Sequence, residues 1–415
     1  MTELTLPMHM GTSLPVATDA PHRRDFADTE PVPANTLAIA FTGSGSEYFR
    51  IWIVNLLLTL VTLGIYYPWA KVRRLRYFYG NTLVGGKPLG FHADPKKMLK
   101  GYVLVGLLLA LYSVAGHFHA VAGLVAFVVV MLIWPALLKS SMQFRLANTS
   151  WRGLRFRFTG DLRGAYAAML PLFVPALCLV AAGTFVPDQE QPPLWYVYVM
   201  GSVMVALLLV SPWLFQRLKA YQHNNYALAS QHTRFNASVG MFYKLFAEVL
   251  VVYLAISVVL GVVVTVVIFV GVAVLGLSGN PFTQGFDGIS MWLIVAAAIG
   301  FIALMLLFVS LIKPYVVTRM QNLVWEQTQS EDIRIHSKLR ARAMMGLSIK
   351  NWLLVVCTLG LYWPFAAIAR ARMQLEAVSV ASQISLDALV SHARSHEGEA
   401  AGDAAGDLFG LDIGF

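Results

Sequence analysis

The residues best suited to chemistry form a basic and aromatic stretch near the first apolar segment. They are Lys71, Arg73, Arg74 and Arg76, followed by Tyr77, Phe78 and Tyr79. Guanidinium groups bind phosphate and carboxylate oxygens through paired hydrogen bonds, so the four basic side chains are candidate contacts for phospholipid headgroups or another anion. Orientation of membrane helices by positive charge is a simpler explanation for most of this charge, because it needs no ligand.

Residue patterns for catalysis are missing. The chain has no HExxH, Walker or GxSxG motif, and Gly43-Ser44-Gly45-Ser46 lacks the strand-to-helix setting of a nucleophile elbow. His392 and His396 are four residues apart and could share a helix face, but no third metal ligand lies near them in this polar tail. We therefore predict no enzyme activity, no metal and no cofactor.

Ion-coupled transport requires charged or titratable side chains inside the membrane. Glu248 lies near the start of an apolar segment and His117 lies in a loop, and no ionisable residue falls at the middle of a segment. This distribution argues against proton-driven pumping and leaves uncoupled flux open.

Composition sets the class of protein. The 415 residues are 57% hydrophobic and 13% charged, with a mean hydropathy of +0.64. These values exclude an ordinary soluble domain, and the long apolar runs exclude the alternating pattern of a membrane β-barrel. Cys178 and Cys357 lie in apolar segments, which predicts no disulfide.

The net charge of +9 comes from Lys and Arg residues that cluster beside the apolar segments. Lipid is therefore the expected anionic partner, and nucleic acid is not.

Eight apolar segments follow the first 36 residues, which contain no signal peptide. They are 49–69, 101–118, 120–138, 165–186, 194–215, 245–277, 289–312 and 346–368. Four of the connecting loops carry eight, six, four and seven Lys or Arg residues (71–100, 139–163, 217–244 and 313–350), whereas the other three carry none. The six central segments are therefore predicted to form three hairpins that leave the cytoplasm and return.

The first and last segments have basic residues at both ends, so the charge count does not fix their topology. If each crosses the membrane, both termini lie outside; if each dips in and returns, both termini are cytoplasmic. We favour cytoplasmic termini, because an internal repeat places the same kind of loop on both sides of these segments. At an offset of 296 residues, Thr62-Leu63-Gly64 and Pro68 match Thr358-Leu359-Gly360 and Pro364 without a gap.

A weaker copy of this pattern recurs at each return to the cytoplasm. Thirteen residues separate Pro68 from Asn81, Pro135 from Asn148 and Pro212 from Asn225, and Pro314 with Asn322 is interpreted as a compressed copy. Short β-branched or aromatic stretches follow each Asn, and one of them contains Gly85-Gly86, a typical two-residue hairpin turn. Because isolated hairpins are marginal, we predict that they pair in a small cytoplasmic β-layer beneath the helices.

Three further groups of polar and turn residues have simple structural interpretations. The repeated asparagines are expected to cap helices or begin turns. Gly64 and Pro68 are expected to mark a helix exit at the headgroup level, with a substrate-binding helix break as the alternative. Asn55 and Asn351, which are repeat equivalents, are expected to join the first segment to the last.

The run TLGIYYPWAKVRRLRYFYGNT, with PKKMLKGY after it and the later copy TLGLYWPFA, resembles the YjgN-like family of bacterial inner-membrane proteins. The resemblance covers nearly the whole chain after residue 35. It implies a multi-pass inner-membrane protein from a domain family of unknown function, and it implies no activity and no functional residues.

The sequence thus predicts an all-α multi-pass membrane protein with six spans, two further apolar segments that span or re-enter, and short cytoplasmic β-hairpins. Its expected parts are a polar tail (1–36), a repeat-built membrane domain (37–372) and an acidic tail (373–415). The first functional hypothesis is passive transport or binding of a lipid-like or anionic ligand. The alternative is a scaffold that recruits a protein partner through its cytoplasmic loops and tails.

Overall fold

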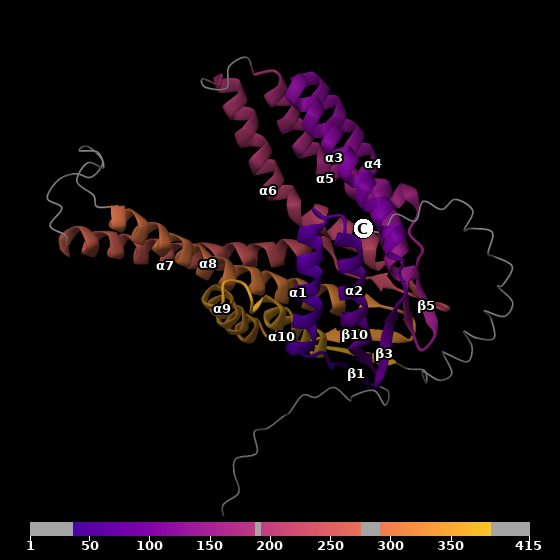
Figure 1. Cartoon of the computed structure of the whole chain (residues 1–415). Coiled ribbons are helices and arrows are strands. Elements are labelled where there is room, and N and C mark those ends of the chain that lie inside the picture. The colour runs from indigo at the N-terminus through magenta and orange to yellow at the C-terminus, as the bar shows by residue number, and fades with distance from the viewer. Residues whose placement is uncertain (1–35, 187–191, 275–290, 383–415) are drawn as a thin grey trace, which may run out of the picture.

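The computed structural model describes residues 36–186, 192–274 and 291–382, and in these ranges the chain forms ten helices and eleven strands (Figure 1). His392 and His396 lie outside the described residues. The predicted boundary at residue 372 falls inside the last helix, and the final strand of the sheet runs on to Ser382.

The elements repeat five times in the order strand, helix, helix, strand. The units are β1 (Thr36–Phe41), α1 (Gly45–Val61), α2 (Tyr67–Gly80), β2 (Thr82–Val84); β3 (Lys87–Phe91), α3 (Pro95–Phe118), α4 (Ala120–Ala147), β4 (Thr149–Trp151); β5 (Leu154–Phe158), α5 (Leu162–Thr184), α6 (Leu194–His223), β6 (Tyr226–Leu228); β8 (Arg234–Phe235), α7 (Val239–Val274), α8 (Met291–Glu326), β9 (Thr328–Gln329); and β10 (Ile333–Ser337), α9 (Ala341–Cys357), α10 (Trp363–Glu376), β11 (Val378–Ser382). The short strand β7 (Gln231–His232) lies between the third and fourth units. The internal repeat predicted from the sequence therefore extends over the whole described chain.

Local sequence explains where the outgoing helices begin. In the first three units the strand ends at Phe, and a Ser or Asp three residues later accepts a hydrogen bond from a backbone N–H of the first helical turn. These N-cap residues are Ser44, Asp94 and Asp161. Such side chains satisfy amide groups that a helix leaves without partners, so each strand passes directly into a helix.

All eleven strands belong to one antiparallel sheet with the order β7-β6-β5-β4-β3-β2-β1-β11-β10-β9-β8. The first and last strands of the chain pair through Thr36 with Ala381 and Ala38 with Ser379. The two edge strands, β7 and β8, are consecutive in the chain and only Thr233 separates them. The sheet therefore curves into a nearly closed barrel.

The predicted all-α fold with a small β-layer needs correction at this point. The hairpins do pair with one another, as β2 with β3 across Gly85-Gly86 and β4 with β5 show, but they continue around a nearly complete ring. The physical reason is that a flat layer would leave two strand edges unpaired, whereas closure leaves almost none. The protein is mostly helical and also has a β-barrel-like domain.

The helix pairs surround this sheet in chain order, and α10 contacts α1, so the ring of helices also closes. Among the described residues, six helices are long and apolar enough to cross a membrane: α3, α4, α5, α6, Val239–Val266 of α7 and Leu304–Glu326 of α8. By length and composition they agree with the six expected spans. Apolar side chains such as Leu107 and Val251 are more than 60% exposed on these helices, as expected for surfaces that face lipid.

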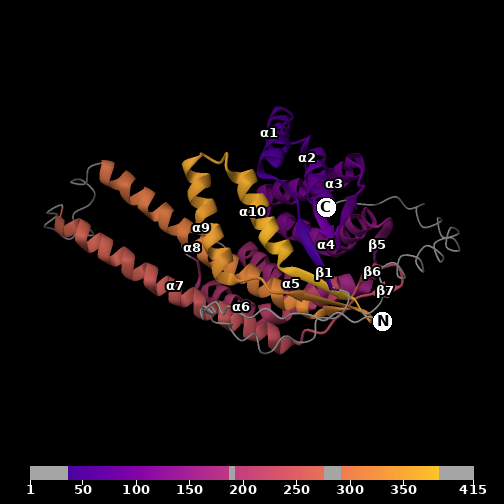
Figure 2. The ribbon, with the colours of Figure 1, turned by 90° about the horizontal axis from the view of Figure 1, so that it is seen from below.

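The first and last apolar segments each form two short helices joined by a tight turn. Leu63 and Gly64 between α1 and α2, and Leu359 and Gly360 between α9 and α10, have φ values between 49° and 92°. Each chain segment therefore returns toward the sheet from which it started (Figure 2). Leu63 and Leu359 at the two tips are both 94% exposed.

Two sequence interpretations change with this geometry. Pro68 does not mark a helix exit at headgroup level, because it lies in the first turn of α2, directly after the tip. Asn55 does not join the first segment to the last: its amide donates to the Ala70 carbonyl of the same helix pair, and Asn351 donates to Ala366 in the same way. The amides therefore hold each short hairpin closed.

Candidate functional site

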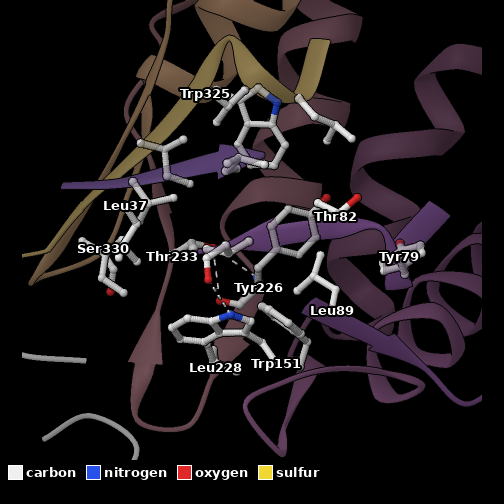
Figure 3. A pocket seen from close by; sticks show the side chains of 18 of the residues that line it. Leu37, Tyr79, Thr82, Leu89, Trp151, Tyr226, Leu228, Thr233, Trp325 and Ser330 are labelled. Atoms are coloured by element: carbon white, nitrogen blue, oxygen red, sulfur yellow. Dashed lines mark hydrogen bonds between the residues drawn. The ribbon is translucent and has the colours of Figure 1, made fainter. Parts of the chain in front are cut away.

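The barrel-like sheet surrounds a cavity of about 690 Å³ (Figure 3). Every strand except β8 contributes to its wall, and α2, α8 and α10 contribute residues near the ends where they meet the sheet. The inward-facing strand residues are mostly aliphatic or aromatic, for example Leu37, Leu89, Trp151, Leu228 and Ile335. Eight strands make a barrel just wide enough for side chains to fill, so eleven leave a space that they do not fill.

Several polar groups in the wall are engaged with the protein itself. The Trp151 indole N–H donates to the Val84 carbonyl at 3.2 Å. Thr233 accepts from the Tyr226 backbone N–H at 3.2 Å and donates to the carbonyls of His223 and Tyr226. These donors and acceptors are satisfied within the protein, and most of the remaining wall is apolar.

Charge is missing from the wall of the cavity. Among the described residues that line it there is no Asp, Glu, His, Lys, Arg or Cys. Burial raises the pKa of Tyr226 to about 12, so its hydroxyl stays neutral at physiological pH. Such a site suits an apolar molecule and does not suit a bare ion.

A ring of backbone hydrogen bonds holds the five units to the rim of the sheet. The residue after the first strand of each unit donates its N–H to the carbonyl of the residue at the end of the returning helix, at 2.8–3.0 Å. The pairs are Thr42 with Asn81, His92 with Asn148, Thr159 with Asn225, Asn236 with Gln327, and Lys338 with Ala377. The fourth copy of the repeat is therefore corrected, because Gln327 follows Pro314 by thirteen residues and takes the place expected for Asn322.

The repeated asparagines have the turn-forming role predicted for them. The side-chain amides of Asn81, Asn148 and Asn225 each donate to the carbonyl four residues earlier, at 2.7–2.8 Å. Asn322 instead bonds to the strand-to-helix loop of the next unit through Ser337 and Leu339.

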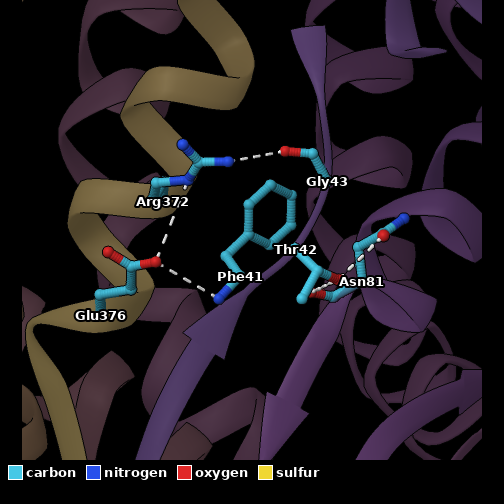
Figure 4. Close-up of polar contacts among 6 residues, drawn as sticks. All are labelled: Phe41, Thr42, Gly43, Asn81, Arg372 and Glu376. Atoms are coloured by element: carbon cyan, nitrogen blue, oxygen red, sulfur yellow. Dashed lines mark hydrogen bonds and ion pairs between the residues drawn. The ribbon is translucent and has the colours of Figure 1, made fainter.

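Side chains on four returning helices donate to the equivalent loop carbonyl of the following unit. The pairs are Arg76 to Ala93, Gln216 to Ala237, Asn322 to Leu339, and Arg372 to Gly43, at 3.0–3.1 Å. The last of these joins the fifth unit to the first (Figure 4). The repeat thus closes through side chains as well as through the strands.

The predicted headgroup contacts separate in the structure. Arg76 is engaged with the Ala93 carbonyl, and Arg73 is exposed. Arg74 lies 6.0 Å from the centre of the Phe78 ring. Lys71 is half-buried beside Arg145 and Arg74, and desolvation followed by these two charges lowers the pKa of Lys71. The stretch therefore divides between Arg76, which makes a structural hydrogen bond, Lys71, which is half-buried, and Arg73, which is exposed.

Sequence reasoning missed the cavity. Its wall comes from strands of two to six residues, too short for an alternating pattern to stand out. One available signal was the equal spacing from Pro314 to Gln327 and from Pro364 to Ala377, which completes five copies of the repeated unit.

Fold and site together define a multi-pass membrane protein that carries a nearly closed β-sheet around an apolar cavity. Residues 36–408 match the family described as bacterial proteins of unknown function (DUF898), and the chain belongs to this family. The YjgN-like resemblance is confirmed.

Relatives support a location in the bacterial inner membrane. The chain is 35% identical over 144 residues to inner membrane protein YjgN of Salmonella typhimurium, covering 34% of this chain and 36% of that protein. It is 28% identical over 190 residues to inner membrane protein YjgN of Escherichia coli (strain K12), covering 43% and 44%. These matches span less than half the length of either relative. No solved structure matches the chain.

Proposed function

We propose that this protein binds the apolar part of a lipid-like ligand in the cavity of its barrel-like sheet. The observation that carries the proposal is the cavity itself, which has a volume of about 690 Å³ and an uncharged wall. This volume lies within the range of roughly 300–1,000 Å³ that is usual for small-molecule sites. An apolar cavity gives water few hydrogen-bond partners, so an acyl or isoprenoid chain is favoured there.

The arrangement of the helices supports a route from the membrane to this cavity. Two of the three helices that line it, α2 and α10, belong to the short hairpins, and α1 contacts α10. The ring of helix pairs therefore has one sector of short elements between α3 and α8. A lipid chain can approach the sheet through this sector without passing between two full-length hairpins.

The charge of the loops supports a cytoplasmic position for the sheet. Each of the four basic loops contains a strand hairpin of the sheet, and positive loops remain in the cytoplasm. The ligand would then bind on the cytoplasmic side of the inner membrane. The proposal assigns a binding role and no catalytic step.

Native mass spectrometry of the protein extracted in mild detergent tests this proposal. Leu228→Trp fills the cavity from β6, and Ile335→Trp fills it from β10. Arg157→Trp is the matched control, because Arg157 is exposed on the strand that pairs with β6. We expect the wild type and Arg157→Trp to retain lipid and the two filled variants to retain clearly less.

Two results would contradict the proposal. One is a wild-type protein that retains no lipid, which would leave the scaffold hypothesis in its place. The other is equal retention by all four proteins when their melting curves show that the filled variants are folded.

A further inference from the structure

Two hydrogen-bonded polar side chains interrupt the apolar wall of the cavity. Gln231 at the start of β7 and Ser330 directly after β9 both line the cavity, and the Ser330 hydroxyl donates to the Gln231 amide oxygen at 2.6 Å (Figure 3 shows Ser330 in the wall). We call these two residues the polar pair. Leu228 of β6 is the register partner of Gln231 and also lines the cavity, so the two side chains share the inner face of the sheet. The polar pair therefore faces the space in which the proposed ligand would lie.

A carboxylate behind the wall fixes the orientation of the polar pair. Asp332, in the turn between β9 and β10, accepts a hydrogen bond from the side-chain amide of Gln231 at 2.8 Å. Because a carboxylate only accepts, the NH2 group of Gln231 points toward Asp332 and its oxygen points toward the Ser330 hydroxyl. The turn itself is held by a hydrogen bond from the Ser330 backbone N–H to the Ile333 carbonyl at 2.7 Å. The pair is thus positioned before a ligand arrives.

The polar pair can form further hydrogen bonds toward the cavity. Among the described residues, its contacts use one of the two amide N–H groups of Gln231 and one of the two lone pairs of the amide oxygen. Ser330 donates its hydroxyl hydrogen and can still accept. A hydroxyl group of a ligand both donates and accepts, so it matches these remaining groups, whereas a purely apolar ligand would leave them without partners.

Charge around the polar pair disfavours an anionic group. The charged side chain bonded to the pair is that of Asp332, and among the described residues no Lys or Arg forms a salt bridge with it. Arg334 is exposed on the opposite face of β10 from Ile333, which lines the cavity. A phosphate or carboxylate at the polar pair would therefore lie near a like charge, in a wall whose described residues provide no cation.

We infer that the polar pair binds an uncharged hydroxyl group of the ligand, which makes the ligand a neutral amphiphile such as a long-chain alcohol or an acylglycerol. The inference rests on the proposed function, because the apolar chain of this ligand occupies the cavity. Gln231 and Ser330 contact the hydroxyl group. Asp332 is a positioning residue that acts through Gln231.

Competition between lipids that share one chain tests this preference. The detergent-solubilised protein is equilibrated with equal amounts of oleyl alcohol and the octadecene that lacks its hydroxyl, and separately with oleyl alcohol and oleyl phosphate. The lipid that co-purifies is extracted and quantified by mass spectrometry. We expect the wild type to enrich the alcohol in both mixtures.

Gln231→Met and Ser330→Ala remove the hydrogen-bonding groups of the polar pair one at a time. Each variant should lower the enrichment of the alcohol over octadecene about fivefold, the factor that corresponds to one hydrogen bond of about 1 kcal/mol. The total lipid retained should stay the same. Gln222→Met and Ser230→Ala are the matched controls, because neither residue lines the cavity, and they should keep the wild-type enrichment.

The positioning role of Asp332 has its own pair of variants. Asp332→Leu removes the acceptor that orients the Gln231 amide and should lower the enrichment, whereas Asp332→Asn keeps an oxygen acceptor and should restore most of it. A merely structural role would lower the melting midpoint and leave the ratio of the two retained lipids unchanged. That result would overturn the positioning role.

Three results would overturn the inference as a whole. The wild type might retain alcohol and octadecene equally or prefer the phosphate; Gln231→Met and Ser330→Ala might both keep the full enrichment; or the matched controls might lose as much as these variants. Each of these results leaves the proposed function standing, because lipid is still retained. If the wild type retains none of the three lipids, the proposed function itself fails.

Discussion

Arg372 is the residue that completes the cycle of five units. Its guanidinium donates to the Gly43 carbonyl at 3.0 Å, and Glu376 on the same helix accepts from the Phe41 backbone N–H at 3.5 Å (Figure 4). We predict that Arg372→Gln lowers the free energy of unfolding by about 1 kcal/mol, a modest value because the side chain is half-exposed. Thermal unfolding in detergent measures this change.

Arg73→Gln is the control for this prediction, because Arg73 is exposed on the equivalent returning helix of the first unit. It should leave the melting midpoint unchanged. A midpoint for Arg372→Gln that matches Arg73→Gln would show that the first and last units are held together by the strands alone.

For single residues, the sequence predicted where a side chain lies better than it predicted which group that side chain forms a hydrogen bond with. The asparagines of the repeat were placed correctly at turns because an Asn amide bonds to nearby backbone, which is a local property. The partners of Arg76 and Asn55 depend on which helix lies beside them, and spacing along the chain does not contain this information.

The two short helical hairpins, α1–α2 and α9–α10, are the elements whose topology the sequence left open. Their tips expose Leu63 and Leu359 almost completely, and such side chains are stable in lipid rather than in water. We predict that cysteines placed at these two positions react poorly with a water-soluble maleimide, in a background with Cys178 and Cys357 replaced. A cysteine in place of Arg157, on the outer face of the sheet, should react well once the membrane is permeabilised so that the maleimide reaches the cytoplasmic side.

Strong labelling of both tip cysteines from the periplasmic side would contradict this geometry, because it would mean that the first and last segments cross the membrane.

The helix pairs were recognisable from composition, since six long apolar runs leave little choice. The turns at the tips were not recognisable, since they require φ near +50° at a leucine, which is not a turn signal.

The whole molecule depends on pairing between its first and last strands. Ala38 of β1 and Ser379 of β11 are direct partners in the antiparallel register. We predict that cysteines at Ala38 and Ser379 form a disulfide that raises the melting midpoint, because it would close a loop that contains nearly all of the folded chain. Cysteines at Ala38 and Ala381, which are two residues out of register with each other, should cross-link much less.

Equal cross-linking of the two pairs would show that β1 and β11 slide past each other and that the sheet is not closed in one register.

Closure of the sheet is the feature that the sequence predicted only in part. The sequence showed that the first and last segments are copies of each other, but a ring requires all five copies, and the fourth and fifth lack the Asn that marks the others.

The central claim is that a lipid chain enters a cavity in the sheet, away from the apolar faces of the helices. Photo-cross-linking with lipids that carry a diazirine at the end of the acyl chain tests it most directly. The account predicts cross-links to the cavity wall, at strand positions such as Leu228 and Ile335, in addition to cross-links to the membrane helices. Cross-links confined to the membrane helices, with none in the strands, would contradict it.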